Sequence, residues 1–246
     1  MRFALPANMG HLDLSDYKRP VAVVLGASCG IGNACARALS GDGYQVHGVS
    51  RTIDNDGAFE QVRADLTDTV GAAAAEDLIR ECNPDALIFC VGETIPDNIT
   101  NVDISITRRL LEVNTLSILG PLRVLVSELP SKPRSVVLIS SIHARGEFDR
   151  LSYSLSKAAL EAIMNSSYDF LMRHHIRINC IRPGPTETKM LLERFPVGSA
   201  ERDSYLKEIP ANRFAETGEI VELVRFLSGS RSQYLTGQVI GIAGGF

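Results

Sequence analysis

Tryptophan is absent from this sequence of 246 residues, and cysteine is scarce. The five cysteines, Cys29, Cys35, Cys82, Cys90 and Cys180, are scattered without a CxxC pair or a metal-ligand spacing with histidine. Disulfide frameworks and structural zinc sites require such clustering. We therefore expect free thiols in a reducing compartment, the cytoplasm, and no bound metal.

Long runs of one charge are also absent. The 25 basic and 29 acidic residues give a formal net charge of −4, without the basic cluster that would indicate nucleic-acid binding. Residues 1–19 are broken by Pro6 and carry Asp13 and Asp16, so they lack the apolar core of a secretory signal. No apolar run is long enough to cross a bilayer. We expect no nucleic-acid partner and no membrane association, with residues 1–19 forming an N-terminal extension.

The chain does contain apolar runs that alternate with segments of helical spacing. The 45% apolar composition supplies the core of one domain, expected over residues 20–246. Several runs, such as VAVVL at 21–25, are apolar without alternation, which is typical of parallel strands covered on both faces. The pattern predicts an α/β fold with a doubly wound parallel sheet of about seven strands and helices on both faces. Strands are expected at 21–25, 44–50, 60–64, 85–91, 135–140, 176–181 and 238–242, and helices near 30–42, 68–82, 105–129, 151–173 and 217–228.

A glycine-rich turn, GASCGIG, follows the first expected strand. Gly26, Gly30 and Gly32 form a G-x-x-x-G-x-G pattern directly before a helix. Such a turn directs free backbone N–H groups and the positive end of the helix dipole outward, and residues without side chains let a pyrophosphate approach. The alternative is a tight turn alone, but the strand-turn-helix context favours a dinucleotide site.

The end of the second strand bears on cofactor choice. Ser50 stands where an acidic residue would favour a free ribose 2′-hydroxyl, and Arg51 follows it. An arginine here can neutralise a 2′-phosphate, which favours NADP(H); the alternative is an exposed arginine after a strand. Asp65 has two equally weighted interpretations, a contact with adenine or a helix cap, and Asp68 is the other candidate for the cap.

Tyr153 and Lys157 lie four positions apart in the helix expected over 151–173, so they share one helical face. Spacing alone fits an aromatic residue beside a solvated lysine equally well. A tyrosine with a pKa near 10 can act as an acid or base near neutral pH only when a neighbouring positive charge stabilises its anion. Lys157 is the candidate for that charge.

From about residue 20 to 246 the chain resembles the simple, single-domain group of the short-chain dehydrogenase/reductase family, which has a Rossmann-type fold. The resemblance is carried by GASCGIG, ADLTD, Asn114 of LEVNTLSILG, ISS at 139–141, YSLSK at 153–157, IRPGPTET at 181–188 and LTGQVIGIAGG. It implies a catalytic tetrad of Asn114, Ser141, Tyr153 and Lys157, with Asn114 holding a water molecule that links Lys157 to solvent. The cofactor residues it implies are Gly26, Ser28, Cys29, Gly30, Ile31, Gly32, Ser50, Arg51, Asp65, Leu66, Cys90, Val91, Gly92, Asn114, Tyr153, Lys157, Pro183, Gly184, Thr186 and Thr188.

Three positions depart from the usual pattern of that family. Phe89-Cys90-Val91-Gly92 replaces N-N-A-G after the fourth strand, so the sheet must be braced differently. Leu25 replaces a threonine before the first glycine. The interval from Ser141 to Tyr153 is 12 residues, one shorter than the commonest interval, which leaves Ser140 as a second candidate for the catalytic serine.

The sequence gives less information on the substrate. Candidate contacts are Glu93, His143, Arg145, Met190 and Leu191, with His143 or Arg145 meeting a polar or anionic group; the alternative is a solvated loop. Residues 186–210 mix apolar and charged residues and are expected to form a substrate lid.

The predicted activity is NADP(H)-dependent hydride transfer between nicotinamide and a small-molecule carbonyl or secondary alcohol, with Tyr153 as general acid/base. The alternatives are a non-catalytic NADP(H)-binding regulator or scaffold, and an epimerase or dehydratase with tightly held cofactor. The resemblance also implies a homodimer or homotetramer, in which helices 105–129 and 151–173 pair with those of other subunits.

Overall fold

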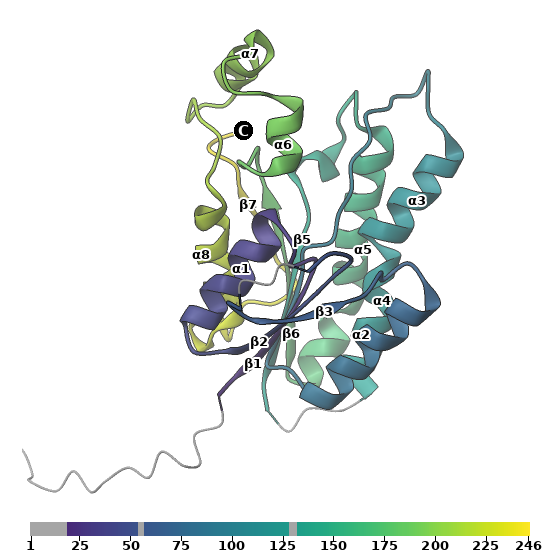
Figure 1. The fold of residues 1–246 in the computed structure, drawn as a ribbon, viewed down its shortest axis with the longest axis vertical. Helices are drawn as coiled ribbons and strands as arrows, with labels where there is room; N and C mark the ends of the chain where they lie inside the picture. Colours follow the sequence, from purple (N-terminus) through teal and green to yellow (C-terminus); the bar gives the residue numbers. More distant parts are fainter. Residues whose placement is uncertain (1–18, 54–56, 128–131) are drawn as a thin grey trace, which may run out of the picture.

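The computed structural model describes residues 19–53, 57–127 and 132–246. Most of the extension expected at residues 1–19 therefore lies outside the described residues. Seven strands form one parallel sheet in the order β3-β2-β1-β4-β5-β6-β7 (Figure 1). The strands are β1 (Val21–Leu25), β2 (Gln45–Ser50), β3 (Glu60–Arg63), β4 (Ala86–Phe89), β5 (Arg134–Ile139), β6 (Ile176–Pro183) and β7 (Val239–Ile242). The prediction of a doubly wound parallel sheet is confirmed.

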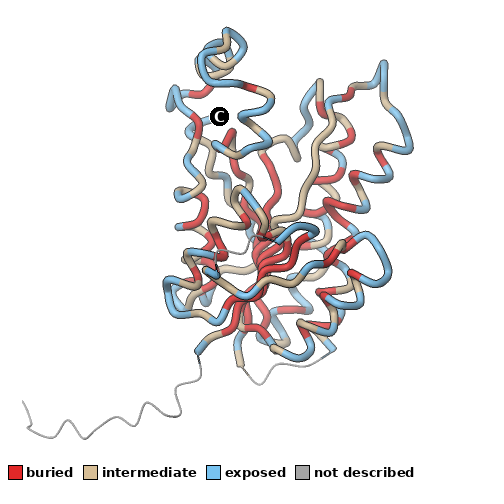
Figure 2. Tube along the Cα trace, in the orientation of Figure 1, coloured by how far each residue is buried: buried red, intermediate tan, exposed pale blue. Residues whose placement is uncertain are grey.

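Helices cover both faces of this sheet. In Figure 1, α1 and α8 lie on one side, and α2, α3, α4 and α5 lie on the other. The helices are α1 (Gly30–Gly41), α2 (Thr69–Cys82), α3 (Ile104–Asn114), α4 (Leu119–Ser127), α5 (Leu151–Arg173), α6 (Lys189–Arg194), α7 (Ala200–Glu208) and α8 (Thr217–Ser228). Because helices screen both faces, the central strands are buried along their whole length (Figure 2).

The strand order reverses beside β1. This strand pairs with β2 on one edge and with β4 on the other, so the connections leave the sheet in opposite directions. In open α/β sheets, a crevice opens at such a switch point outside the carboxyl ends of the strands. The turn that begins at Gly26 and the segment after Phe89 both lie at this edge.

The long helix expected over 105–129 is interrupted. The chain leaves helical geometry at Thr115, with φ −135° and ψ −60°, and passes through a short 3₁₀ turn, Leu116–Ile118, before α4. The Thr115 hydroxyl donates to the carbonyl of Ser156 in α5, at 2.6 Å. Pro121 falls in the first turn of α4, where its missing N–H costs no helical hydrogen bond. Residues 128–129 of the expected helix lie outside the described residues.

The stretch Ile104–Ser127 is also long and apolar enough, by length and composition, to cross a membrane. However, 56% of its apolar window is buried inside the protein. The core helix of a globular protein has the same character, so this stretch is weak support for a membrane span.

The segment expected to form a lid contains α6 and α7, which stand above the carboxyl edge of the sheet in Figure 1. Phe195, Ile209 and Phe214 form a small separate core there. The Phe195 ring stacks on Tyr205 with centroids 4.7 Å apart. This segment thus has apolar packing of its own, beside the cavity described below.

Candidate active site

A cavity of about 800 Å³ opens at the carboxyl edge of the sheet. Apart from Asn114, all the residues predicted to contact the cofactor line it. Its lining includes the glycine turn, Ser141, Tyr153 and the start of α6, where the Thr188 side chain lies 3.2 Å from a Cβ built on Gly30. One continuous cavity therefore joins the predicted nucleotide site to the predicted catalytic residues.

The glycine turn has the shape that a pyrophosphate requires. Gly26 has φ +89° and Gly30 has φ +55°, in the region that favours glycine. A Cβ on Gly32 would lie 2.0 Å from the Gly26 carbonyl oxygen. The turn then leads directly into the N-terminus of α1, whose first N–H groups have no helical partners. These residues fit a dinucleotide cofactor.

Two neighbouring serines follow β5, and their bonds distinguish them. Ser140 is buried and donates to the Glu161 carboxylate at 2.7 Å, so its hydroxyl is engaged in the core. Ser141 lines the cavity, and its Oγ accepts the His143 backbone N–H at 3.2 Å. Its side chain also lowers the pKa of Tyr153, against the larger effect of burial. This arrangement favours Ser141 as the catalytic serine.

Tyr153 and Lys157 project from one face of α5 into the cavity. The Lys157 ammonium lies 6.0 Å from the Tyr153 ring centroid and donates to the Ile139 carbonyl oxygen at 2.9 Å. Burial lowers the pKa of Lys157 to about 8.

The electrostatics of Tyr153 differ from the expectation that Lys157 lowers its pKa. Burial raises the pKa of Tyr153 above its usual value, and the opposing contributions come from the hydrogen bond to Ser141 and the charge of Arg150. The guanidinium carbon of Arg150 lies 5.9 Å from the Tyr153 ring centroid. Arg150 is therefore a nearby positive charge that lowers the pKa of Tyr153.

Asn114 lies behind the cavity wall rather than on it. Its Oδ1 accepts the Glu93 backbone N–H at 2.7 Å, and its Nδ2 donates to the Glu93 carbonyl and the Ser156 hydroxyl, both at 2.9 Å. The side chain is thereby fully engaged by the segment after β4 and by α5. This differs from the expectation of a direct cofactor contact, and it makes Asn114 a positioning residue.

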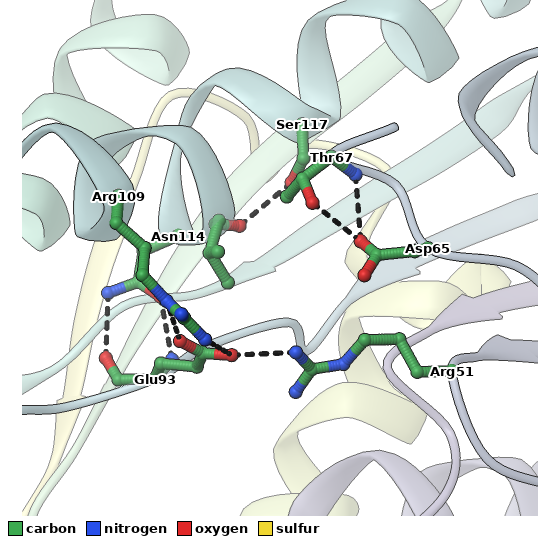
Figure 3. Close-up of polar contacts among 8 residues, drawn as sticks. Arg51, Asp65, Thr67, Glu93, Arg109, Asn114 and Ser117 are labelled. Carbon is green, nitrogen blue, oxygen red and sulfur yellow. Dashed lines mark hydrogen bonds and ion pairs between the residues drawn. The ribbon is translucent and has the colours of Figure 1, made fainter. Parts of the chain in front are cut away.

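Three charged side chains, Arg51, Glu93 and Arg109, meet at the cavity, and Arg51 and Glu93 line it (Figure 3). Arg51 donates to the Glu93 carboxylate at 2.8 Å, and Arg109 donates to the same carboxylate at 3.0 and 3.3 Å. Burial raises the pKa of Glu93, but the bonds from Arg109 and Arg51 outweigh this and hold it below its usual value. Glu93 was predicted at the substrate; the structure places its carboxylate between two arginines instead.

The two aspartates after β3 have separate positions. Asp68 caps α2 by accepting the Gly71 N–H at 2.6 Å. Asp65 lines the cavity and accepts from the backbone and hydroxyl of Thr67 at 3.0 and 2.7 Å (Figure 3). The structure therefore gives the cap to Asp68 and leaves Asp65 beside the nucleotide site.

The altered segment Phe89-Cys90-Val91-Gly92 is braced without asparagine. Cys90 donates its N–H to the Leu25 carbonyl at 2.8 Å, which ties this segment to β1. Two effects raise the pKa of Cys90 well above its usual value: the hydrogen bond with Cys35, which is the larger, and burial. The Cys90 thiol, packed against Cys35, thus stands where the family usually carries a polar side chain.

The end of the cavity near Tyr153 includes His143, whose ring centroid lies 6.3 Å from that of Tyr153, and the lining also includes Met190 and Leu191. All three are predicted substrate contacts. Burial and the charge of Arg150 lower the pKa of His143 to about 4, so this histidine is neutral at pH 7. Arg145 is exposed and lies outside the cavity lining, because the short 3₁₀ turn Ile142–Arg145 directs it to the surface. The predicted contact with Arg145 is therefore not made.

Sequence reasoning missed two arginines at this end, Arg150 and Arg194. The spacing of Arg150, three residues before Tyr153, was the available signal, because residues three apart share a helical face. No local pattern distinguishes Arg194 from the other charged residues of its segment. Among the described residues, no group of three or more His, Cys, Asp or Glu side chains is placed to hold a metal ion.

The parallel sheet, the glycine turn and the serine, tyrosine and lysine in one cavity define an oxidoreductase that binds a nicotinamide dinucleotide. A family model described as Enoyl-(Acyl carrier protein) reductase matches residues 26–246. The chain belongs to the short-chain dehydrogenase/reductase family, which confirms the resemblance.

Individual relatives agree over nearly the whole chain. The uncharacterised oxidoreductase YmfI of Bacillus subtilis is 28% identical over 92% of this chain and 98% of its own. The 7α-hydroxysteroid dehydrogenase of Clostridium sardiniense is 28% identical over 92% of each chain. The structure of a short chain dehydrogenase family protein from Francisella tularensis superposes with a TM-score of 0.84, at 26% identity, over 93% of this chain and 98% of that one.

Proposed function

We propose that this protein is an NADP(H)-dependent reductase of carbonyl compounds, or dehydrogenase of secondary alcohols, with Tyr153 as general acid/base. One observation carries the proposal: Ser141, Tyr153 and Lys157 line the same cavity as the glycine turn. A nucleotide-binding regulator has no need of a tyrosine that lines the cavity beside a serine and a buried lysine.

The roles of the chain's own residues follow from their positions. The glycine turn and the N-terminus of α1 bind the pyrophosphate, and Lys157 orients the ribose next to the nicotinamide. When bound, the nicotinamide supplies or accepts hydride and, in its oxidised form, adds a positive charge. In reduction, Tyr153 donates its proton to the substrate oxygen while Ser141 hydrogen-bonds that oxygen. Asn114 keeps the segment after β4 in register with α5.

The proposed preference for NADP(H) is supported by Arg51 and Arg109. Both arginine side chains are more than half exposed, and their guanidinium groups pair with one carboxylate, that of Glu93. A 2′-phosphate bound there accepts charge-assisted hydrogen bonds from Arg51. The phosphate either replaces the Glu93 carboxylate as the acceptor or shares the guanidinium with it. A hydrogen bond to a charged group contributes about 1.5–3 kcal/mol, which corresponds to roughly 10–100-fold in affinity.

The test of the activity is NADPH consumption across ketones, β-ketoacyl thioesters and cyclic diketones, with products identified. Tyr153→Phe should keep NADPH binding and lose nearly all turnover, because it lacks the transferable proton. Turnover by Tyr153→Phe at the wild-type rate would exclude Tyr153 as the proton donor. NADPH binding without turnover on any substrate would favour the regulator.

The test of cofactor preference is titration with NADPH and NADH. NADPH should bind more tightly, and Arg51→Ala should weaken NADPH binding by roughly 10–100-fold while changing NADH binding little. Equal affinities of the wild-type protein for the two cofactors would remove the role assigned to Arg51.

The proposed assembly is a homodimer or homotetramer that pairs α4 and α5 between subunits. Leu116, Leu119 and Leu155 are exposed apolar residues on or beside these helices. Light scattering after size-exclusion chromatography tests this, and a monomer at all concentrations would contradict it.

A further inference from the structure

Two arginines from different elements line the cavity beyond Tyr153. Arg150 stands at the N-cap of α5 and is only 9% exposed, and Arg194 is the last residue of α6. The guanidinium carbon of Arg150 lies 5.9 Å from the Tyr153 ring centroid. Both cations are therefore at the substrate end of the cavity, away from Arg51 and Arg109 at the nucleotide end.

These guanidinium groups have few partners. Arg150 donates to the Thr94 hydroxyl at 3.0 Å, and no carboxylate of the described residues lies within 4.0 Å of its nitrogens. Arg194 pairs with Asp149 through Nη2, but its Nη1 is buried without a hydrogen-bond partner among the described residues. Burying a cation without a counter-charge costs several kcal/mol, on the order of the penalty per ion seen in protein interiors.

The acidic side chains nearby do not balance this charge. Among the described residues, Asp149 is the one carboxylate paired with either arginine, so the three side chains Arg150, Arg194 and Asp149 carry a net positive charge. Glu193 lines the cavity but pairs with a lysine of its own helix. Arg150 and Arg194 also line a neighbouring hollow of about 430 Å³, and the carboxylates in its lining are Glu147, Asp149, Glu201 and Glu208. Glu147 lies 3.5 Å from the His143 ring nitrogen. Within the described residues, none of these carboxylates except that of Asp149 lies within 4.0 Å of either guanidinium.

Arg150 is held in place by the start of α5. Asp97 accepts the Ser152 N–H on its carboxylate at 3.0 Å and the Leu151 N–H on its backbone carbonyl at 3.2 Å. The backbone next to Arg150 is thereby fixed, and the hydrogen bond to Thr94 holds the guanidinium itself beside Tyr153. A guanidinium that is held by one hydroxyl and has no carboxylate partner among the described residues keeps further N–H groups to donate to a carboxylate.

We infer that the substrate carries a carboxylate, bound by Arg150 and Arg194, within a few bonds of the carbonyl or hydroxyl carbon that Tyr153 serves. The inference rests on the proposed reductase function and names its substrate class: short keto acids or the corresponding hydroxy acids. Ile142, Met190, Leu191 and Tyr205 line the same end of the cavity and contact an apolar substrate body. Arg150 and Arg194 are thus specificity-determining residues.

Two measurements test the inference. The first compares kcat/KM with NADPH for 3-oxohexanoate and 4-oxopentanoate against their methyl esters, which keep the ketone and remove the charge. The second uses calorimetry on the NADPH-loaded protein to compare binding of hexanoate and hexanamide, which does not depend on turnover. Both are made on wild type, Arg150→Gln, Arg194→Gln and, as a matched control, Arg145→Gln, whose arginine is exposed outside the cavity.

We expect the wild-type protein to favour each acid over its ester, and hexanoate over hexanamide, by at least about tenfold. Arg150→Gln should reduce this preference about tenfold, mainly through KM, and Arg194→Gln should reduce it in the same direction, whereas Arg145→Gln should retain it. Equal turnover of acids and esters, or an equal loss for both in Arg150→Gln, would overturn the carboxylate subsite while leaving the reductase function in place. Binding of hexanoate that depends on Arg150, without reduction of any ketone, would support the subsite and contradict the reductase function.

Discussion

Replacing Gly32 by alanine tests whether the glycine turn has the closed geometry that binds the cofactor. The added Cβ would lie 2.0 Å from the Gly26 carbonyl oxygen, whereas contacts under 3.0 Å are essentially never seen, so the turn must open by at least 1.0 Å (3.0 − 2.0). A forced shift of a packed backbone costs about 1–3 kcal/mol. In a protein of this size the loss corresponds to a fall in Tm of roughly 2–12 °C.

The same shift moves the N–H groups that the pyrophosphate needs. Losing one charge-assisted hydrogen bond weakens NADPH binding by roughly 10–100-fold. Gly41→Ala is the matched control, because Gly41 is in the same helix, is exposed and has no atom within 4 Å of an added Cβ. Alanine there should raise stability by up to about 1 kcal/mol. Thermal denaturation and fluorescence titration measure both effects, and wild-type NADPH affinity in Gly32→Ala would refute the reasoning.

Two further predictions concern charged residues of the cavity. Burial lowers the pKa of Lys157 from 10.5 to about 8, so between these values the folded protein binds fewer protons than the unfolded chain, and the contribution of Lys157 to stability rises with pH. Lys157→Met should therefore raise the Tm of the cofactor-free protein near pH 7, and its free energy of unfolding should increase by at most about 3 kcal/mol. This gain in stability should shrink as the pH is raised toward about 9.5. A gain that stays constant with pH would contradict the interpretation that Lys157 is charged and buried. Glu93→Gln should tighten NADPH binding roughly tenfold, because it frees Arg51 for the phosphate, with exposed Glu112→Gln as control. Unchanged affinity in Glu93→Gln would show that the carboxylate does not compete with the phosphate.

Much of the fold was predictable because its signals are local. The run VAVVL is apolar at every position, and it forms a strand that is buried at every position. The glycines of GASCGIG are the residues that a tight strand-to-helix turn requires, and the turn has that form. Tyr153 and Lys157 were expected on one helical face, and both line the cavity.

Features that depend on distant partners were not predictable in this way. The interruption at Thr115 is stabilised by a bond to Ser156, 41 residues along the chain, so helical periodicity continues through it in the sequence. Glu93 lies between Arg51 and Arg109, which come from positions 42 residues before and 16 residues after it. The role of Asn114 was also not predictable from its neighbours in the sequence, because its hydrogen-bond partners are Glu93 in the segment after β4 and Ser156 in α5.

The sequence by itself determined the order of strands and helices, the glycine turn and the residues able to transfer a proton, because hydrophobic periodicity and backbone sterics act over a few residues. Only the tertiary structure decided which charges meet in the cavity. It placed Arg150 beside Tyr153, brought Arg194 to the lining of the same cavity and directed Arg145 to the surface. Electrostatic partners are set by distances between elements far apart in the chain, and these distances exist only after the sheet has formed and the helices have packed on it.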